Sequence, residues 1–383
     1  MPLNDLHSDT KPLLFTPLTI RGVTLPNRVV ISPMVQYRAV DGFIGDFHIA
    51  HLGKFALGRA GVIFTEATAV EARGRITAGD LGLWSDEQIP GMRRLTDYLR
   101  SEGSVSAIQL AHGGRKSSGQ RAMDGNGPIG AAEIAKGQTP WETVGPTTEP
   151  VSAGWPAPHA LSETEIAGIV ASFGVAAQRA DAAGFDIAEI HGAHGYLIAT
   201  FLSPISNTRN DGYGGDRAGR MRIALETARA VRAVWPEHKP LFFRISTFDG
   251  AEGGWNLEDS VVLAAALKEC GVDVVDCSSG GLTGSATAAP IPRHPGFQVP
   301  FASEIRRKTG IMTQAVGLIL DGPQAEAILQ AGDADLIAIG REALLDPFWA
   351  LHAADALGVD DRFALWPEEY GWWLEKRSKS LVR

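Results

Sequence analysis

The feature that most constrains this chain is a series of eight short apolar stretches spread along most of its length. Each is almost continuously apolar and rich in β-branched residues, which is typical of strands buried on both faces of a parallel sheet. The stretches are residues Arg28–Pro33, Gly61–Ala67, Val105–Ala111, Phe185–His191, Leu241–Ser246, Val272–Ser278, Ile311–Val316 and Leu336–Gly340. Their regular recurrence predicts eight strands of one parallel sheet.

Amphipathic segments of helical length separate most of these stretches. The clearest, Ser162–Ala182, opens with Ser-Glu-Thr-Glu, a capping-box pattern. The others are Arg220–Val234, Glu258–Glu269, Gln324–Gln330 and Ala343–Ala356. Strands that alternate with helices in this way predict an α/β fold, a (β/α)8 TIM barrel. A Rossmann sheet is disfavoured, because the first stretch ends in Ser32-Pro-Met-Val35 instead of a glycine-rich phosphate loop.

Three additions to a minimal barrel are expected. Residues Leu14–Leu25 alternate around Arg21-Gly22 and predict an N-terminal β-hairpin that plugs the N-terminal mouth of the barrel. Residues 113–160 and Gly280–Val299 are long excursions rich in glycine and proline. Both follow the carboxyl ends of strands, where barrel active sites lie, so we expect long loops over that face. With no repeat and no low-complexity tract, residues 1–383 are expected to form a single domain.

Composition removes several classes of function. A net charge of −9 gives no electrostatic reason to expect binding to nucleic acid or to an anionic membrane. No apolar run approaches the ~18 residues of a membrane span. The two cysteines, Cys270 and Cys277, cannot form a disulfide framework and suit a reducing compartment. The first ten residues are polar and lack the apolar core of a signal peptide, so a cytoplasmic protein is expected.

The segment with the strongest chemical signal is His191-Gly-Ala-His194-Gly-Tyr196, at the end of the fourth stretch. Two imidazole N–H groups can hold a carbonyl oxygen and stabilise the charge that develops on it, and a nearby phenol can supply a proton. A His-x-x-His metal site and a pair of core histidines remain alternatives. A zinc site requires three or four ligands, and the nearest carboxylate, Glu189, lies earlier in the buried strand and not in the loop with the histidines. No metal is therefore predicted.

The last two stretches suggest a phosphate site. Gly317 follows the seventh stretch, and Gly340-Arg341 follows the eighth. In many barrels these two loops bind phosphate, because glycine lets backbone N–H groups approach the oxygens and arginine binds them bidentately. The alternative is that Gly-Arg merely opens a surface helix.

Two polar residues, Gln109 and Arg244, interrupt otherwise apolar strands. A buried arginine requires an anionic partner. The ring of a reduced flavin is one candidate, and Glu189 or Glu66 inside the barrel is the structural alternative.

Taken in order, the motifs of this chain resemble those of the Old Yellow Enzyme family of flavin-dependent ene-reductases. The similarity is to its thermophilic-like branch of bacterial NADPH dehydrogenases and xenobiotic reductases, and it extends from about Leu14 to the C-terminus. The motifs are Asn27–Met34, Glu66-Ala67, Gly82–Asp86, Gln109–Lys116, His191–Leu197, Phe201–Asp216 and Gly340-Arg341.

This resemblance implies a barrel that binds FMN and takes its electrons from NADPH or NADH. The residues expected to bind FMN are Ser32, Pro33, Met34 and Val35 along the ring, Ala67 at its edge, Gln109 and Arg244 at the pyrimidine, and Gly317, Gly340 and Arg341 at the phosphate. The residues expected to act on the substrate are His191 and His194, which would grip its oxygen, Tyr196, which would protonate Cα, and Tyr37 and Trp373, which would contact it. The substrates implied are activated alkenes (enones, enals, maleimides and nitroalkenes), and a homodimer or higher oligomer is expected.

The main departure from the branch is Val35, where a cysteine is usual. An apolar side chain there predicts an altered flavin potential and substrate preference. Another FMN-barrel oxidoreductase, a nitro or xenobiotic reductase or a dehydrogenase running in the desaturating direction, remains the alternative. A cofactor-free barrel lyase is less favoured, because no lysine or carboxylate base stands at a strand end.

Overall fold

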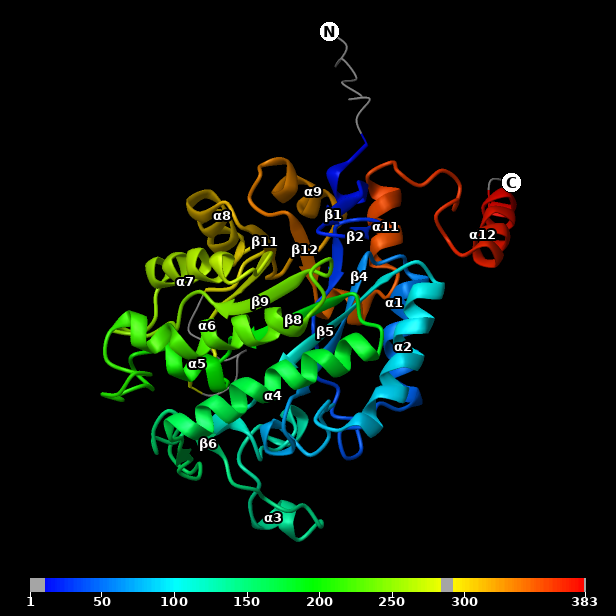
Figure 1. The fold of residues 1–383 in the computed structure, drawn as a ribbon. Helices are drawn as coiled ribbons and strands as arrows, with labels where there is room; N and C mark the ends of the chain where they lie inside the picture. Colours follow the sequence, from blue (N-terminus) through cyan, green and yellow to red (C-terminus); the bar gives the residue numbers. More distant parts are fainter. Residues whose placement is uncertain (1–10, 284–291, 382–383) are drawn as a thin grey trace.

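The computed structural model of the protein describes residues 11–283 and 292–381. Within these ranges, eight parallel strands close into a barrel in chain order (Figure 1). The strands are β3 (Val29–Ile31), β4 (Val62–Ala69), β5 (Val105–Ala111), β8 (Ile187–Gly192), β9 (Leu241–Ser246), β10 (Val274–Ser278), β11 (Met312–Ala315) and β12 (Leu336–Ile339). All eight coincide with the predicted stretches, and the (β/α)8 barrel is confirmed.

A helix follows each strand and packs on the outside of the barrel. These helices are α1 (Asp46–Leu57), α2 (Ile89–Ser101), α4 (Glu163–Ala182), α6 (Arg217–Val234), α7 (Leu257–Glu269), α8 (Val299–Thr309), α9 (Gly322–Gln330) and α11 (Trp349–Ala356). The capping box that opens α4 is present, because the Glu165 N–H donates to Ser162 Oγ. The sequence patterns did not predict α1, α2 or α8.

The prediction of a single helix over Ala343–Ala356 is wrong. The structure has α10 (Arg341–Leu345) and then α11, with Asp346 in an extended conformation between them. Pro347 explains the break: it has no N–H to donate, and its ring pushes the preceding residue out of the helical region.

Within the described residues, the core consists of two separate apolar clusters. The larger lies between the outer face of the sheet and the helices. The smaller lies inside the barrel at the end closed by the N-terminal hairpin, where Val62, Phe64 and Phe242 pack with residues of the hairpin. That hairpin is β1 (Leu18–Ile20) paired with β2 (Val23–Leu25), and its residues Ile20 and Leu25 are buried in the small cluster. The expected plug is therefore present.

The excursion 113–160 is ordered and contains α3 (Ala131–Ile134) and the short pair β6 (Val144–Gly145) and β7 (His159–Ala160). The second expected excursion, Gly280–Val299, falls partly outside the described residues, as does the polar segment 1–10. The remaining helices are α5 (Leu197–Leu202), next to the site, and α12 (Glu368–Leu381), which was not predicted. In Figure 1, α12, drawn in red, stands apart from the barrel. None of the described helices is long and apolar enough to cross a membrane.

Candidate active site

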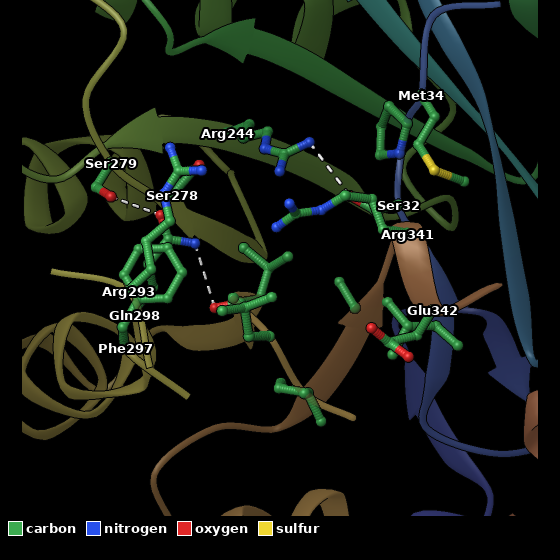
Figure 2. Close-up of a pocket in the computed structure, with 18 of the residues that line it drawn as sticks. Ser32, Met34, Arg244, Ser278, Ser279, Arg293, Phe297, Gln298, Arg341 and Glu342 are labelled. Carbon is green, nitrogen blue, oxygen red and sulfur yellow. Dashed lines mark hydrogen bonds between the residues drawn. The ribbon is translucent and has the colours of Figure 1, made fainter. Parts of the chain in front are cut away.

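A cavity of about 300 Å³ opens at the carboxyl ends of β3 and β9 to β12 (Figure 2). It has the place in the fold that barrel active sites occupy. Of the predicted site residues, its lining contains Ser32, Pro33, Met34, His194, Arg244, Gly317, Gly340 and Arg341. The sequence reasoning missed Ser278, Ser279, Arg293, Phe297, Gln298, Val316, Leu318, Ile319, Ala338, Ile339 and Glu342. The two serines lie at the end of a predicted strand, which is a signal that could have identified them.

The cavity has a cationic lining in a chain of negative net charge. Among the described lining residues are three arginines, Arg244, Arg293 and Arg341, and one carboxylate, Glu342. In Figure 2, Arg293 and Arg341 enter from opposite sides of the hollow. Guanidinium groups that converge in this way favour an anionic ligand with several oxygens, such as a phosphate.

The backbone at Gly317 is shaped for close approach. Its φ of 120° lies in a region that L side chains rarely adopt, and an added Cβ would lie 3.0 Å from the Gln298 amide nitrogen. The Gly317 carbonyl accepts a hydrogen bond of 2.9 Å from the Gly296 N–H. A conformation of this kind suits a loop that presents backbone to a ligand.

Arg244 has an anionic partner that the sequence did not indicate. Its Nε lies 3.1 Å from Oδ2 of Asp276 on the neighbouring strand, and its Nη1 donates over 3.4 Å to Ser32 Oγ. Neither carboxylate proposed from the sequence is this partner. Glu189 accepts a hydrogen bond of 2.7 Å from Gln109 Nε2, and Glu66 accepts one of 2.8 Å from the Gln36 N–H.

The structure brings His191, His194 and Tyr196 together. The three ring centroids lie 5.0 to 6.4 Å apart. Positive φ angles of 60° at His194 and 68° at Gly195 turn the chain back sharply, so that Tyr196 is directed toward the same point. His191 and Tyr196 do not line the cavity, but both contact His194, which does.

Hydrogen bonds assign the tautomers of the two histidines. His191 Nδ1 accepts from the Ala193 N–H over 3.1 Å, so its proton lies on Nε2, 3.3 Å from His194 Nδ1. His194 Nδ1 is therefore an acceptor, and His194 Nε2–H donates to Ser278 Oγ over 2.7 Å. The result is a chain of donors that runs from His191 through His194 to Ser278.

Both imidazoles are neutral at physiological pH. Burial lowers the pKa of each well below its usual value, and the charges of Arg244 and Lys116 lower the two pKa values further. Burial also raises the pKa of Tyr196, with a smaller contribution from Asp80. Tyr196 therefore keeps its proton and can donate it.

Lys116 fixes the loops around these residues. Its ammonium donates to the His194 carbonyl over 2.8 Å and also to the Gly281 carbonyl. Burial and the neighbouring Arg115 lower the pKa of Lys116 to about 7. Its position beyond the third strand agrees with the sequence, which placed it in the loop and not at a strand end.

The remaining predicted residues lie at various distances from the cavity. Ala67 and Gln109 are paired across β4 and β5, beyond an irregularity of register after Phe64. Tyr37 has a positive φ of 59°, and burial raises its pKa. Val35 is partly buried and directly follows the cavity residue Met34. The described residues contain no group of three or more His, Cys, Asp and Glu that could hold a metal.

Trp373 is not brought to the site by its own chain. It lies on α12, is 66% exposed, and packs against Trp372. The structure of one chain therefore leaves its predicted contact with substrate untested.

The cavity fits FMN on grounds of charge and shape. FMN has an anionic phosphate at one end and a ring whose reduced form is anionic at the other. Arg341, Gly317 and Gly340 would hold the phosphate, and Arg244, the most deeply buried of the three arginines, would face the ring.

Comparisons with known proteins agree with this geometry. The family model of the NADH:flavin oxidoreductase / NADH oxidase family matches residues 13–359. The NADPH dehydrogenase of Geobacillus sp. (strain WCH70) is 45% identical over 349 residues, which cover 91% of this chain and 95% of the relative. The NADPH dehydrogenase of Bacillus subtilis (strain 168) is 44% identical over 351 residues, covering 91% and 96%.

The comparison with solved structures gives the same result. A morphinone reductase in complex with tetrahydroNAD has a TM-score of 0.72 and 27% identity, covering 92% of this chain and 93% of that structure. The resemblance to the Old Yellow Enzyme family is confirmed, and with it FMN as cofactor and NAD(P)H as electron donor. This chain belongs to the NADH:flavin oxidoreductase / NADH oxidase family.

Proposed function

We propose that this oxidoreductase is an ene-reductase, which reduces the C=C bond of activated alkenes such as enones, enals, maleimides and nitroalkenes. The observation that carries the proposal is the grouping of two neutral histidines and a protonated tyrosine at the edge of the cavity that fits FMN. Bound FMN would supply the chemistry of hydride transfer, from NAD(P)H to the β-carbon of the alkene.

The histidines would bind the electron-withdrawing oxygen of the substrate. His191 Nε2 lies 3.3 Å from His194 Nδ1, and an oxygen that enters between the rings would accept a hydrogen bond from the His191 Nε2–H. With its own proton on Nδ1, His194 would donate to the same oxygen while Ser278 reverses and donates to Nε2. Two preorganised donors stabilise the negative charge that develops on that oxygen.

Tyr196 would protonate the α-carbon, because its raised pKa keeps the phenol protonated. Tyr37 would contact the substrate from the loop after β3. Around the cofactor, Ser32, Pro33, Met34 and Val35 would line the ring, Ala67 would lie at its edge, and Gln109 and Arg244 would bind the pyrimidine.

Anaerobic stopped-flow spectroscopy tests this function. The FMN-loaded protein is reduced with NADPH and, separately, with NADH, and is then mixed with 2-cyclohexenone, a nitroalkene or a maleimide. We expect fast reoxidation and a saturated product, with Tyr196→Phe slowing reoxidation but not reduction. Reoxidation by nitro groups alone, or reduction of the oxidised FMN by a saturated ketone with no reoxidation by any alkene, would support another oxidoreductase of the same family and contradict the proposal.

We further propose that the chain acts as a homodimer or higher oligomer. In the described structure α12 has no buried residue, and Trp372 and Trp373 are 50% and 66% exposed. Exposed tryptophans on a protruding helix are typical of a surface that a partner covers. Trp373 would reach a substrate pocket only in such an assembly. Light scattering tests this, and a monomer at micromolar concentration would contradict it.

A further inference from the structure

A layer of buried polar side chains crosses the barrel just below the cavity. It consists of Gln109 on β5, Glu189 on β8, Arg244 on β9, Asp276 on β10 and Gln314 on β11. Register places Gln109 opposite Glu189, Arg244 opposite Asp276, and Asp276 opposite Gln314, whereas between β8 and β9 it is Phe242 that lies opposite Glu189, one inward position before Arg244. Only Arg244 lines the cavity, so the other four form a floor beneath it.

The charges in this layer do not balance when both carboxyls are ionised. Arg244 supplies one positive charge, whereas Glu189 and Asp276 supply two negative charges, and the three residues are 7%, 0% and 0% exposed. On the opposite side of the barrel, β3, β4 and β12 contribute Val30, Phe64 and Ala338 to the apolar cluster that packs around the N-terminal hairpin. An uncompensated charge in such surroundings costs several kcal/mol, about the cost of one unpaired buried ion.

The ion pair with Arg244 indicates which carboxyl is ionised. Asp276 Oδ2 lies 3.1 Å from Arg244 Nε, which favours the anion. Glu189 receives one hydrogen bond, from Gln109 to Oε1, and its Oε2 has no partner among the described residues. Both oxygens of Asp276 also lack a hydrogen-bond partner among the described residues, so the ion pair distinguishes the two carboxyls. A proton on Glu189 Oε2 disturbs no contact, whereas a proton on Asp276 would weaken its ion pair with Arg244.

We propose that Glu189 and Asp276 hold a single proton between them at neutral pH, and that this proton sets the charge which Arg244 presents to FMN. The inference rests on the proposed placement of Arg244 at the flavin ring. Burial, and then the repulsion of Asp276, raise the pKa of Glu189, in agreement with the geometry. The other titratable group on the inner face of β8 is His191, which is neutral.

The proposal makes Glu189 and Asp276 positioning residues that act on FMN through Arg244. With one proton bound, the layer is neutral. Above the pH at which that proton leaves, the layer carries a net negative charge, which disfavours the more negative reduced cofactor and lowers its potential. Stability of the reduced cofactor is thus linked to a proton that neither FMN nor substrate binds.

The test compares midpoint potentials of the FMN-loaded protein from acidic to alkaline pH, in wild type, Glu189→Gln, Asp276→Asn and the double variant. Each single variant keeps one acid, which pairs with Arg244, so its potential should equal that of wild type at neutral pH. Each should also lack the extra fall of the wild-type potential at alkaline pH. The double variant leaves Arg244 uncompensated and should have a higher potential throughout.

If the midpoint potential of FMN rose equally in both single variants at neutral pH, the proposal would be overturned, because the two acids would then be ionised independently. Infrared difference spectra supply a second readout: a protonated carboxyl band present in wild type should vanish in Glu189→Gln, and its absence from wild type would also overturn the proposal. Absence of the band from wild type overturns the proposal even when a variant does not fold.

A control for net charge is Glu226→Gln on α6, where Glu226 accepts a hydrogen bond from Tyr213 outside the barrel. Its potential should match wild type at every pH. The potentials are measured without an alkene, so a protein that reduces no alkene would refute the proposed function and leave this inference standing.

Discussion

Ser278→Ala tests whether the orientation of His194 contributes to substrate binding separately from its presence. Ser278 Oγ lies 2.7 Å from His194 Nε2, and the hydrogen bond between them orients the imidazole both when Ser278 accepts from Nε2–H and when it donates to Nε2. Its removal deletes one buried hydrogen bond, worth about 0.5–1.5 kcal/mol. At about 1.36 kcal/mol per factor of ten, this predicts a roughly 2- to 13-fold loss in alkene turnover. By contrast, His194→Phe removes a hydrogen-bond donor to the substrate oxygen and should lower alkene turnover by a factor of about 10²–10³.

Phenol titration of the oxidised protein measures the same interaction at equilibrium, because a phenolate oxygen takes the place of the substrate oxygen. We expect the Kd for phenol to rise by the same small factor in Ser278→Ala and far more in His194→Phe. The matched control is Ser303→Ala, whose hydroxyl donates over the same 2.7 Å to Asp333 on the outside of the barrel. An unchanged Kd in Ser278→Ala, or a loss as large as that of His194→Phe, would refute the role of Ser278 in orienting His194.

Three further predictions concern other parts of the structure. Burial lowers the pKa of His51 to about 4, so the unfolded chain binds more protons at this residue below about pH 6.5. The difference in the free energy of urea unfolding between wild type and His51→Phe should therefore shift against wild type as pH drops from 6.5 toward 4, and a pH-independent difference would contradict the buried neutral state. Leu25→Ala should lower the free energy of unfolding, measured with urea, by about 2–5 kcal/mol, because Leu25 is fully buried in the barrel plug. If the variant still binds FMN normally, the effect concerns the fold alone. Val35→Cys should change both the flavin potential and the order of preference among alkenes, measured by reductive titration and steady-state kinetics; identical values in both assays would disprove a role for this position.

The sequence predicted the strands well because each barrel strand is buried on both faces and therefore reads as a continuous apolar run. The helices were harder. The pattern for α1, Asp-Phe-His-Ile-Ala-His-Leu-Gly-Lys-Phe-Ala-Leu, mixes apolar residues on several sides, and α1 follows Gly45, which has no side chain to cap it. The helix α12 has no buried face among the described residues, so no apolar stripe marks it.

The site was predicted where neighbours in sequence act together and missed where distant segments meet. His191, His194 and Tyr196 lie within six residues of one another, and their convergence was predicted. Asp276 is one polar residue in a buried strand, and only its register with Arg244 gives it a role. Arg293 and Arg341 face the same cavity from segments far apart in sequence, so their pairing depends on closure of the barrel.

The residues that face the inside of the barrel nevertheless follow a sequence pattern, because they are every second residue along each strand. Along β8 the inward positions run Ile187, Glu189, His191; along β9 they run Phe242, Arg244, Ser246; and along β10 they run Val274, Asp276, Ser278. Each strand passes from an apolar residue to a charged one and then to a polar group at the site. Because side chains on a strand alternate between faces, a change at the first level should affect stability, one at the second level the potential of FMN, and one at the third level the binding of substrate. Leu25→Ala, Glu189→Gln and Ser278→Ala probe these levels in turn, and a variant whose effect appeared in the assay of another level would show that the levels are energetically coupled.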